Sequence, residues 1–167
     1  MSNKAVYKIA SNGIVAAIYF VLTVISTPFA FGQIQIRIAE ALIFLCFFRR
    51  DFVIGVTLGC LLSNLTSPLG YWDVLVGTGA TLVSSLLVAY LSPRLLVACI
   101  YPVVLNAFAV GWELFYVLSL PFWESVLFVS IGEAIAVFLG YLFFMLMKKR
   151  KGFFEVFKAE RNLDFKF

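Results

Sequence analysis

The sequence contains no histidine and very little charge. Only 13% of its 167 residues are Asp, Glu, Lys or Arg, whereas 63% are hydrophobic. A water-soluble domain needs far more polar surface than this. Without histidine, zinc sites and His-based catalytic sites are excluded, because the commonest transition-metal ligand and general base is missing. We therefore expect an integral membrane protein that is not an enzyme and holds no metal.

Cysteine is scarce as well. Cys46, Cys60 and Cys99 lie inside apolar runs and show no CxxC spacing. This pattern is typical of small buried hydrophobic residues and not of disulfides or metal ligands. The phosphate-binding string GxxxxGK[ST] is also missing from the sequence, so we expect neither a nucleotide-binding domain nor a cofactor.

Apolar segments make up most of what is present. At about 20 residues per span, the chain accommodates an all-α bundle of six transmembrane helices, formed by residues 1–151. Residues 152–167 form a cytoplasmic or interfacial tail. The first segment lacks a small-x-small cleavage pattern, so it predicts a span and not a signal peptide. The spans are predicted at residues 7–25, 34–48, 52–65, 73–91, 95–118 and 124–147.

The basic residues indicate an orientation. The net charge is +4, which in a soluble protein would suggest nucleic acid as a partner. With six spans, every Lys and Arg except Arg37 falls on one side of the membrane. The positive-inside rule then places both termini in the cytoplasm, with the chain in a bacterial plasma membrane and no nucleic acid bound.

Polar side chains on the opposite half are the candidate functional residues, since they are costly in a bilayer unless they face protein, water or ligand. Arg37 and Glu40 can touch on a helix, and a self-neutralising pair without a ligand is the alternative there. Asp73 suits a helix N-cap equally well. We predict a small-molecule site formed by Gln35, Arg37, Glu40, Asp73, Asn106 and Glu113, with Gln33 nearby and Glu133 deeper.

Carboxylates outnumber cations in this set, which favours a ligand with hydrogen-bond donors or a positive charge. A flat heterocycle would suit aromatic side chains in the lining. A guanine-like edge presents an N–H and an NH2 side by side, and one glutamate can accept both.

Gly13 and Ala17 give the first span a smooth side that another helix can approach closely. Packing inside the same chain and docking of a partner are equally compatible with this pair.

Two strings resemble those of the QueT family. The first is GQIQIRIAEAL at residues 32–42, and the second is GVTLGC at residues 55–60. Matching residues follow at Asn64, Ser67, Pro68, Gly70, Trp72, Asp73 and Gly77. Ala39 departs from the serine of many relatives, which weakens any hydrogen-bonding role for that position. The similarity covers about residues 5–147.

The resemblance implies a substrate-binding (S) component of an energy-coupling factor (ECF) transporter. Such a subunit captures a queuosine precursor, here expected to be 7-aminomethyl-7-deazaguanine, beneath a lid at residues 29–33. The resemblance also implies a transmembrane coupling subunit and two ATPase subunits as partners, with Gly13 and Ala17 as the docking stripe. Glu113 or Glu40 would take the guanine edge, another carboxylate the amine, and Arg37 the ring carbonyl.

Other classes remain open. An S component for another vitamin or purine-like base is the closest rival, because pocket residues and not the fold select a ligand. A small self-sufficient secondary transporter would be expected to show inverted repeats, and none is evident. An intramembrane enzyme would depend on paired carboxylates such as Glu113 and Glu133.

Overall fold

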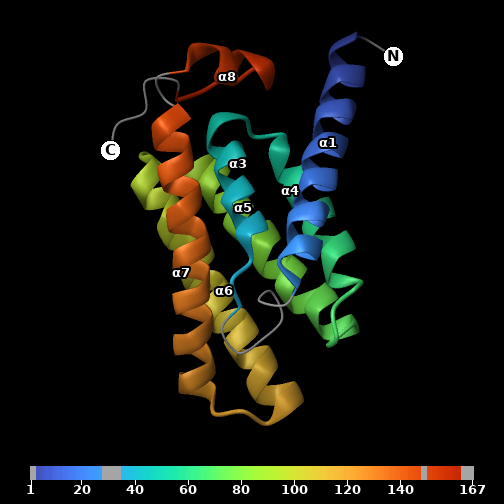
Figure 1. Ribbon diagram of the computed structural model, residues 1–167, viewed down its shortest axis with the longest axis vertical. Coiled ribbons are helices and arrows are strands. Elements are labelled where there is room, and N and C mark those ends of the chain that lie inside the picture. Colours follow the sequence, from blue (N-terminus) through green and yellow to red (C-terminus); the bar gives the residue numbers. More distant parts are fainter. Residues whose placement is uncertain (1–2, 28–34, 148–149, 163–167) are drawn as a thin grey trace.

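The chain is all-α over the residues that the computed structural model describes, which are 3–27, 35–147 and 150–162 (Figure 1). The longer helices are α1 (Asn3–Ile25), α4 (Phe52–Asn64), α5 (Thr78–Leu91), α6 (Leu95–Leu118) and α7 (Phe122–Met147). The shorter elements are the 3-10 helix η1 (Ile38–Ile43), α3 (Phe44–Phe48), the π-helical turn η2 (Asp73–Gly77) and α8 (Lys151–Val156). The predicted all-α class is confirmed, and these described residues contain no strand.

Four segments are long and apolar enough to cross a bilayer: Asn3–Ile25, Asp73–Leu91, Leu95–Leu118 and Phe122–Met147. Two shorter apolar helices, Ile38–Phe48 and Phe52–Asn64, lie in the bundle with them. At ~1.5 Å per α-helical residue and ~2.0 Å per 3-10 residue, each is roughly 20 Å long, against a hydrocarbon core of about 30 Å. The chain is thus suited to several crossings, and the number six stays a prediction.

The second apolar segment begins differently from its prediction. A helix was expected from residue 34, but the helix begins at Ile38 and Arg37 before it has φ −92° and ψ 87°. The reason lies in the alternation of Gln35, Ile36 and Arg37, which buries both polar side chains and leaves Ile36 partly exposed. Such a period of two is typical of extended chain. Of the two expectations for this short span, a helix from residue 34 or a first turn that belongs to the loop, the described residues 35–37 agree with the second.

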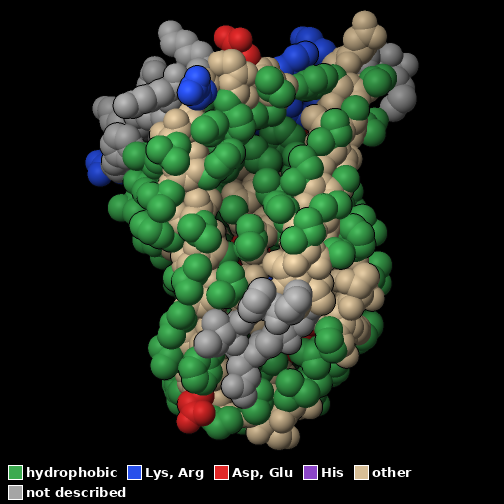
Figure 2. Space-filling model, in the orientation of Figure 1, with side chains coloured by type: hydrophobic (Ala, Val, Ile, Leu, Met, Phe, Trp, Pro, Cys, Tyr) green, Lys and Arg blue, Asp and Glu red, His purple; other side chains and the backbone are tan. Residues whose placement is uncertain are grey.

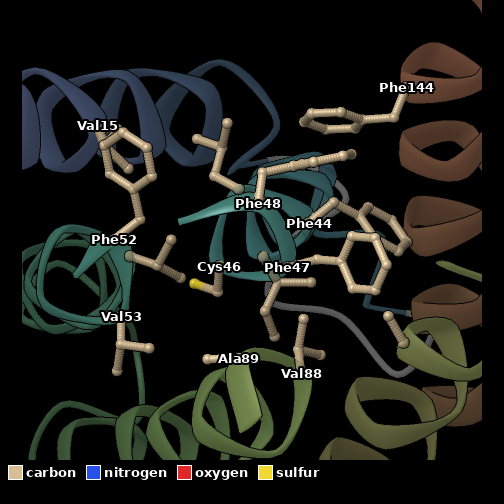
Figure 3. Close-up of a cluster of buried hydrophobic side chains, with 14 of the residues drawn as sticks. Val15, Phe44, Cys46, Phe47, Phe48, Phe52, Val53, Val88, Ala89 and Phe144 are labelled. Carbon is tan, nitrogen blue, oxygen red and sulfur yellow. The ribbon is translucent and has the colours of Figure 1, made fainter. Parts of the chain in front are cut away.

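The short helix α3 lies in the middle of the bundle. All five of its residues are buried, and Figure 3 shows Phe44, Phe47 and Phe48 among side chains from the surrounding helices. Phe144 of α7 stacks on Phe48 with ring centroids 5.5 Å apart, and Phe52 of α4 belongs to the same cluster. A helix in contact with lipid must be long enough to cross the bilayer. Because other helices surround α3, it can be shorter.

Glycines of α4 let α1 approach closely. A Cβ atom added to Gly59 would lie 2.5 Å from the Cβ of Tyr19, and one added to Gly55 would lie 2.8 Å from the carbonyl oxygen of Asn12. Gly13 of α1 has nothing within 4 Å of such an atom, and Ala17 is exposed. The internal contact of α1 therefore uses one face, and the Gly13/Ala17 stripe lies on another that faces outward.

The N-terminus of α1, the α3–α4 turn and α8 lie at one end of the molecule, which we call the basic end, and the α6–α7 turn lies at the other (Figure 1). Residues 150–162 pack on the basic end. The backbone N–H groups of Glu160 and Arg161 donate to the carbonyl oxygen of Phe48, and the Asn162 side chain donates to that of Phe47. The tail thus binds carbonyl groups left open at the end of α3.

Candidate functional site

Arg37 is at the centre of a buried polar cluster. Its side chain is 6% exposed, and its Nη2 atom lies 3.1 Å from Oδ1 of Asp73 in an ion pair. Its Nη1 atom donates to Oδ1 of Asn64 at 3.4 Å. These contacts join the extended segment before η1 to the end of α4 and to the turn that opens α5. The predicted proximity of Arg37 and Asp73 is therefore present, although the two residues are 36 positions apart in the chain.

The π-helical turn η2 shapes the side of the cluster that carries Asp73. The Oδ2 atom of Asp73 accepts a hydrogen bond from the Ser67 hydroxyl group, and the Asp73 backbone carbonyl accepts one from Asn64 Nδ2 at 2.9 Å. A Cβ atom added to Gly77 would lie 3.0 Å from Asn64 Nδ2 and 3.4 Å from Arg37 Nη1, so glycine leaves room for the guanidinium. The N-cap role is wrong, because helical residues precede Asp73. Single π-helical turns are frequent at functional sites.

Glu40 lies in η1 and is fully buried. Its Oε1 atom accepts hydrogen bonds from the hydroxyl groups of Tyr19 at 2.5 Å and Thr81 at 3.1 Å. Its Oε2 atom has no hydrogen-bond partner within the described part of the chain. We expected Arg37 and Glu40 to form an ion pair on one helix. Arg37 precedes that helix, which begins at Ile38, and it forms its ion pair with Asp73 instead.

Glu113 of α6 is the most unusual group in the cluster. Its side chain is 0% exposed, and neither carboxyl oxygen has a hydrogen-bond partner among residues 3–27, 35–147 and 150–162. The Asp73 carboxyl group lies within hydrogen-bonding reach of Glu113, where only a protonated carboxyl group could donate, and Arg37 is a second charged neighbour; α6 packs against η2. Native proteins rarely leave a buried carboxyl group without partners, and each such group calls for an explanation.

Asn106 does not face Glu113 directly. The two residues share a face of α6 but lie two turns apart, about 10 Å at ~1.5 Å per residue. The Asn106 Nδ2 atom donates to Oε1 of Glu133 at 2.9 Å, and Glu133 is 2% exposed. Glu40 and Arg37 are the charged neighbours of Glu133, so this pair forms a deeper layer of the same cluster.

Gln35 lies against α7 and is 4% exposed. A Cβ atom added to Gly132 would lie 2.5 Å from the carbonyl oxygen of Gln35 and 2.8 Å from its carbonyl carbon. Real Cβ atoms do not approach backbone this closely, so only glycine allows the extended segment to lie on α7. Gly132 therefore positions the segment that carries Arg37.

Some expectations are not met in this cluster. The aromatic residues Trp72, Trp112 and Tyr116 contact one another, but Trp112 and Tyr116 are 44% and 61% exposed, so they belong to the surface of α6. The buried phenylalanines gather around α3 at the other end. The predicted lid at residues 29–33, with Gln33, lies outside the described residues.

Several hydrogen-bonding residues of the cluster were missing from the predicted site. Asn64 and Ser67 belong to a stretch whose composition predicts a turn, and they also contact Arg37 and Asp73. Tyr19 and Thr81 carry no signal beyond a polar atom in an apolar helix. Nothing in the local sequence shows that they face a carboxylate on a distant segment.

Comparison with known proteins gives two findings. The model of a family described as "QueT transporter" matches residues 9–149. The chain is also 32% identical to the queuosine precursor transporter QueT of Lactococcus lactis subsp. cremoris (strain MG1363), over 90% of this chain and 97% of that protein. No solved structure matches significantly. The helical bundle with its spanning segments agrees with a transporter, and we conclude that the chain belongs to the QueT transporter family.

Proposed function

We propose that this chain is the substrate-binding subunit of an ECF-type transporter that imports a queuosine precursor, 7-aminomethyl-7-deazaguanine. The Lactococcus relative is a queuosine precursor transporter by name. The chain has no nucleotide-binding string of its own, so transport driven by ATP needs partner ATPases and a coupling subunit. With six crossings and both termini in the cytoplasm, the polar cluster lies in the outer half of a bacterial plasma membrane.

The observation that carries the proposal is the buried carboxyl group of Glu113 beside the Arg37–Asp73 ion pair, because no N–H or hydroxyl group of the described chain donates to either of its oxygens. A guanine-like edge offers two parallel N–H donors, which are the complement of two free carboxyl oxygens. Charged hydrogen bonds of this kind contribute about 1.5 to 3 kcal/mol each. Oε2 of Glu40 is a second open acceptor, suited to the aminomethyl cation, and Arg37 can donate to the ring carbonyl.

Ligand identity is tested on the purified full-length chain. We expect mass spectrometry of co-purified small molecules to detect the aminomethyl deazaguanine. Calorimetry should show that this compound binds at least tenfold more tightly than guanine, which lacks the cationic arm. Equal affinity for guanine would contradict the assigned substrate, and tighter binding of an unrelated vitamin would assign the chain to another specificity.

Partner dependence is tested through the Gly13/Ala17 stripe. Because nothing lies within 4 Å of a Cβ atom on Gly13, Gly13→Leu is expected to fold and bind precursor normally while abolishing uptake. Gly79→Leu is the matched control, since that position is equally open but lies on α5. Normal uptake by Gly13→Leu would show that the stripe does not dock a partner and only faces lipid. Uptake by the chain alone in liposomes would favour a self-sufficient secondary transporter.

A further inference from the structure

A second cavity, separate from the polar cluster, lies between α1 and α7. Its volume is about 620 Å³, and Figure 2 shows the surface hollowed between these two helices. Residues of α1 from Tyr7 to Leu22 form one wall, and residues 139–144 of α7 form the other. η1 and α3 form the floor, and residues 153–157 close the basic end. We call this cavity the α1–α7 groove.

The lining excludes a polar substrate. Tyr7 and Ser11 are the only residues with polar side chains along the groove within the described part of the chain, and both lie at the basic end. The rest of the wall offers aliphatic and phenylalanine side chains with no hydrogen-bonding group. An occupant must therefore be apolar over most of its length, with any polar part near Tyr7.

The dimensions indicate a slender occupant. From Tyr7 to Leu22 the groove follows α1 for roughly 22 Å at ~1.5 Å per residue. This exceeds the depth of one leaflet, about half of a ~30 Å hydrocarbon core. A helix about 10 Å across and equally long would occupy roughly 1,700 Å³, so it would enter the groove only in part. A single hydrocarbon chain fits, and the groove opens sideways between helices that cross the membrane.

The basic end adds a charge requirement. Lys8 is exposed on α1, and the exposed Lys158 has its Nζ atom 3.9 Å from the ring centroid of Tyr7. Asp51 is engaged by two hydrogen bonds from Arg49. Glu155 and Glu160 are exposed acids on α8 and the turn after it, and the exposed Lys4, Lys8, Arg150 and Lys158 outnumber them. Basic pockets between transmembrane helices at this level attract anionic lipid headgroups.

We propose that the α1–α7 groove binds one acyl chain of an anionic phospholipid whose headgroup lies against Lys8 and Lys158. This inference depends on the chain lying in a bilayer and not on the identity of the transported precursor. The acyl chain supplies the van der Waals contacts that the groove lining lacks in the protein alone. The lipid therefore fills the space between α1 and α7 that no described side chain occupies.

The test is native mass spectrometry of the full-length chain with added phosphatidylglycerol or phosphatidylcholine of the same acyl composition. Wild type is expected to retain one lipid and to prefer phosphatidylglycerol. Ile14→Trp places an indole in the groove and should lower lipid retention at least tenfold. Val21→Trp is the matched control, because Val21 is similarly exposed on α1 but does not line the groove.

The headgroup is tested with Lys8→Gln and Lys158→Gln, each expected to reduce the preference for the anionic lipid about fivefold. Arg94→Gln, on the exposed α5–α6 turn, should leave it unchanged. Equal retention by wild type and Ile14→Trp would overturn the proposal, as would equal affinity for the two lipids. Cross-linking of position 14 to a coupling subunit, with no lipid retained by the free chain, would identify the groove as a protein interface instead. Precursor binding measured on the same samples separates these outcomes from a failure of the proposed transport function.

Discussion

Two buried arginines flank the same short segment and differ in how completely their surroundings are paired. Arg37 precedes η1 and Arg49 follows α3, and both are nearly inaccessible. Arg49 donates four hydrogen bonds, two to Asp51, one to Ser11 and one to the carbonyl oxygen of Phe157. Around Arg37, by contrast, Glu113 and Oε2 of Glu40 have no hydrogen-bond partner among the described residues.

This difference separates a structural centre from a candidate binding centre. The Arg49 network joins α1, the α3–α4 turn and the segment after α8, and its acceptors all come from the chain itself. The cluster around Arg37 keeps acceptors for which the described chain supplies no donor. Unpartnered buried acceptors are destabilising, so their presence is best explained by a ligand that donates to them.

Replacing Arg49 should give the largest effect on stability. Arg49→Met removes two of the three side-chain hydrogen bonds to Asp51, leaves the one from Asn12, and takes the donor from the Phe157 carbonyl. Breaking the ion pair of a buried arginine costs about 3 to 5 kcal/mol. Thermal unfolding in detergent measures this loss. Arg50→Met is the matched control, since Arg50 is exposed and makes one long hydrogen bond of 3.4 Å. Equal melting temperatures for the two variants would remove the structural role of Arg49.

Replacing Glu113 should separate affinity from stability. Glu113→Gln is expected to lower precursor affinity about 10- to 100-fold, because a charged hydrogen bond contributes about 1.5 to 3 kcal/mol. The same change removes a buried carboxyl group without partners, so the ligand-free protein should melt at the same or a higher temperature. Calorimetry and thermal unfolding are measured side by side. If Glu113→Gln lowers stability but leaves precursor affinity unchanged, Glu113 has a structural role like that of Arg49 and does not bind the ligand.

A methyl group at Gly132 should disturb the Arg37 cluster through the backbone. Gly132→Ala drives a Cβ atom toward the Gln35 carbonyl, and overpacking of this kind costs about 1 to 3 kcal/mol. We expect a loss of precursor affinity of about tenfold, whereas Gly79→Ala, at an open position, has little effect. A double-mutant cycle with Arg37→Lys tests whether Gly132 affects precursor affinity by positioning Arg37. Strict additivity would show that Gly132 does not act through Arg37.

The smallest effect is a pH dependence at the basic end. Burial at the turn opposes the charge of Asp51, but the hydrogen bonds and positive charge of Arg49 outweigh it and lower the Asp51 pKa. A lowered pKa in the folded state means that the stabilisation is present above the unfolded value, about 3.9, and is lost as pH falls through the folded value. Asp51→Asn should therefore have a lower melting temperature than wild type at pH 7, which corresponds to a loss of about 1 kcal/mol in the free energy of unfolding. A difference that stays constant down to strongly acid pH would contradict the coupling to Arg49.

Hydropathy and charge along the chain were enough to predict an all-helical membrane protein, and the boundaries of the apolar segment Asp73–Leu91 and of α6 and α7 agree with prediction to within about two residues. Apolar periodicity and length constrain such helices locally. Arg37 and Asp73 were also predictable as buried polar residues that need partners, because an ionisable group in an apolar segment stands out without any knowledge of the fold.

Contacts between distant segments were decided by tertiary packing. The extended form of residues 35–37 depends on Gly132, about a hundred positions away, and the pairing of Arg37 with Asp73 depends on how α4 and η2 meet. The partners of Glu40 come from α1 and α5, and neither Tyr19 nor Thr81 differs locally from other polar residues in apolar helices. Local sequence determines which groups are costly to bury. Only the packed bundle determines which of them are paired by the protein and which remain open to a ligand.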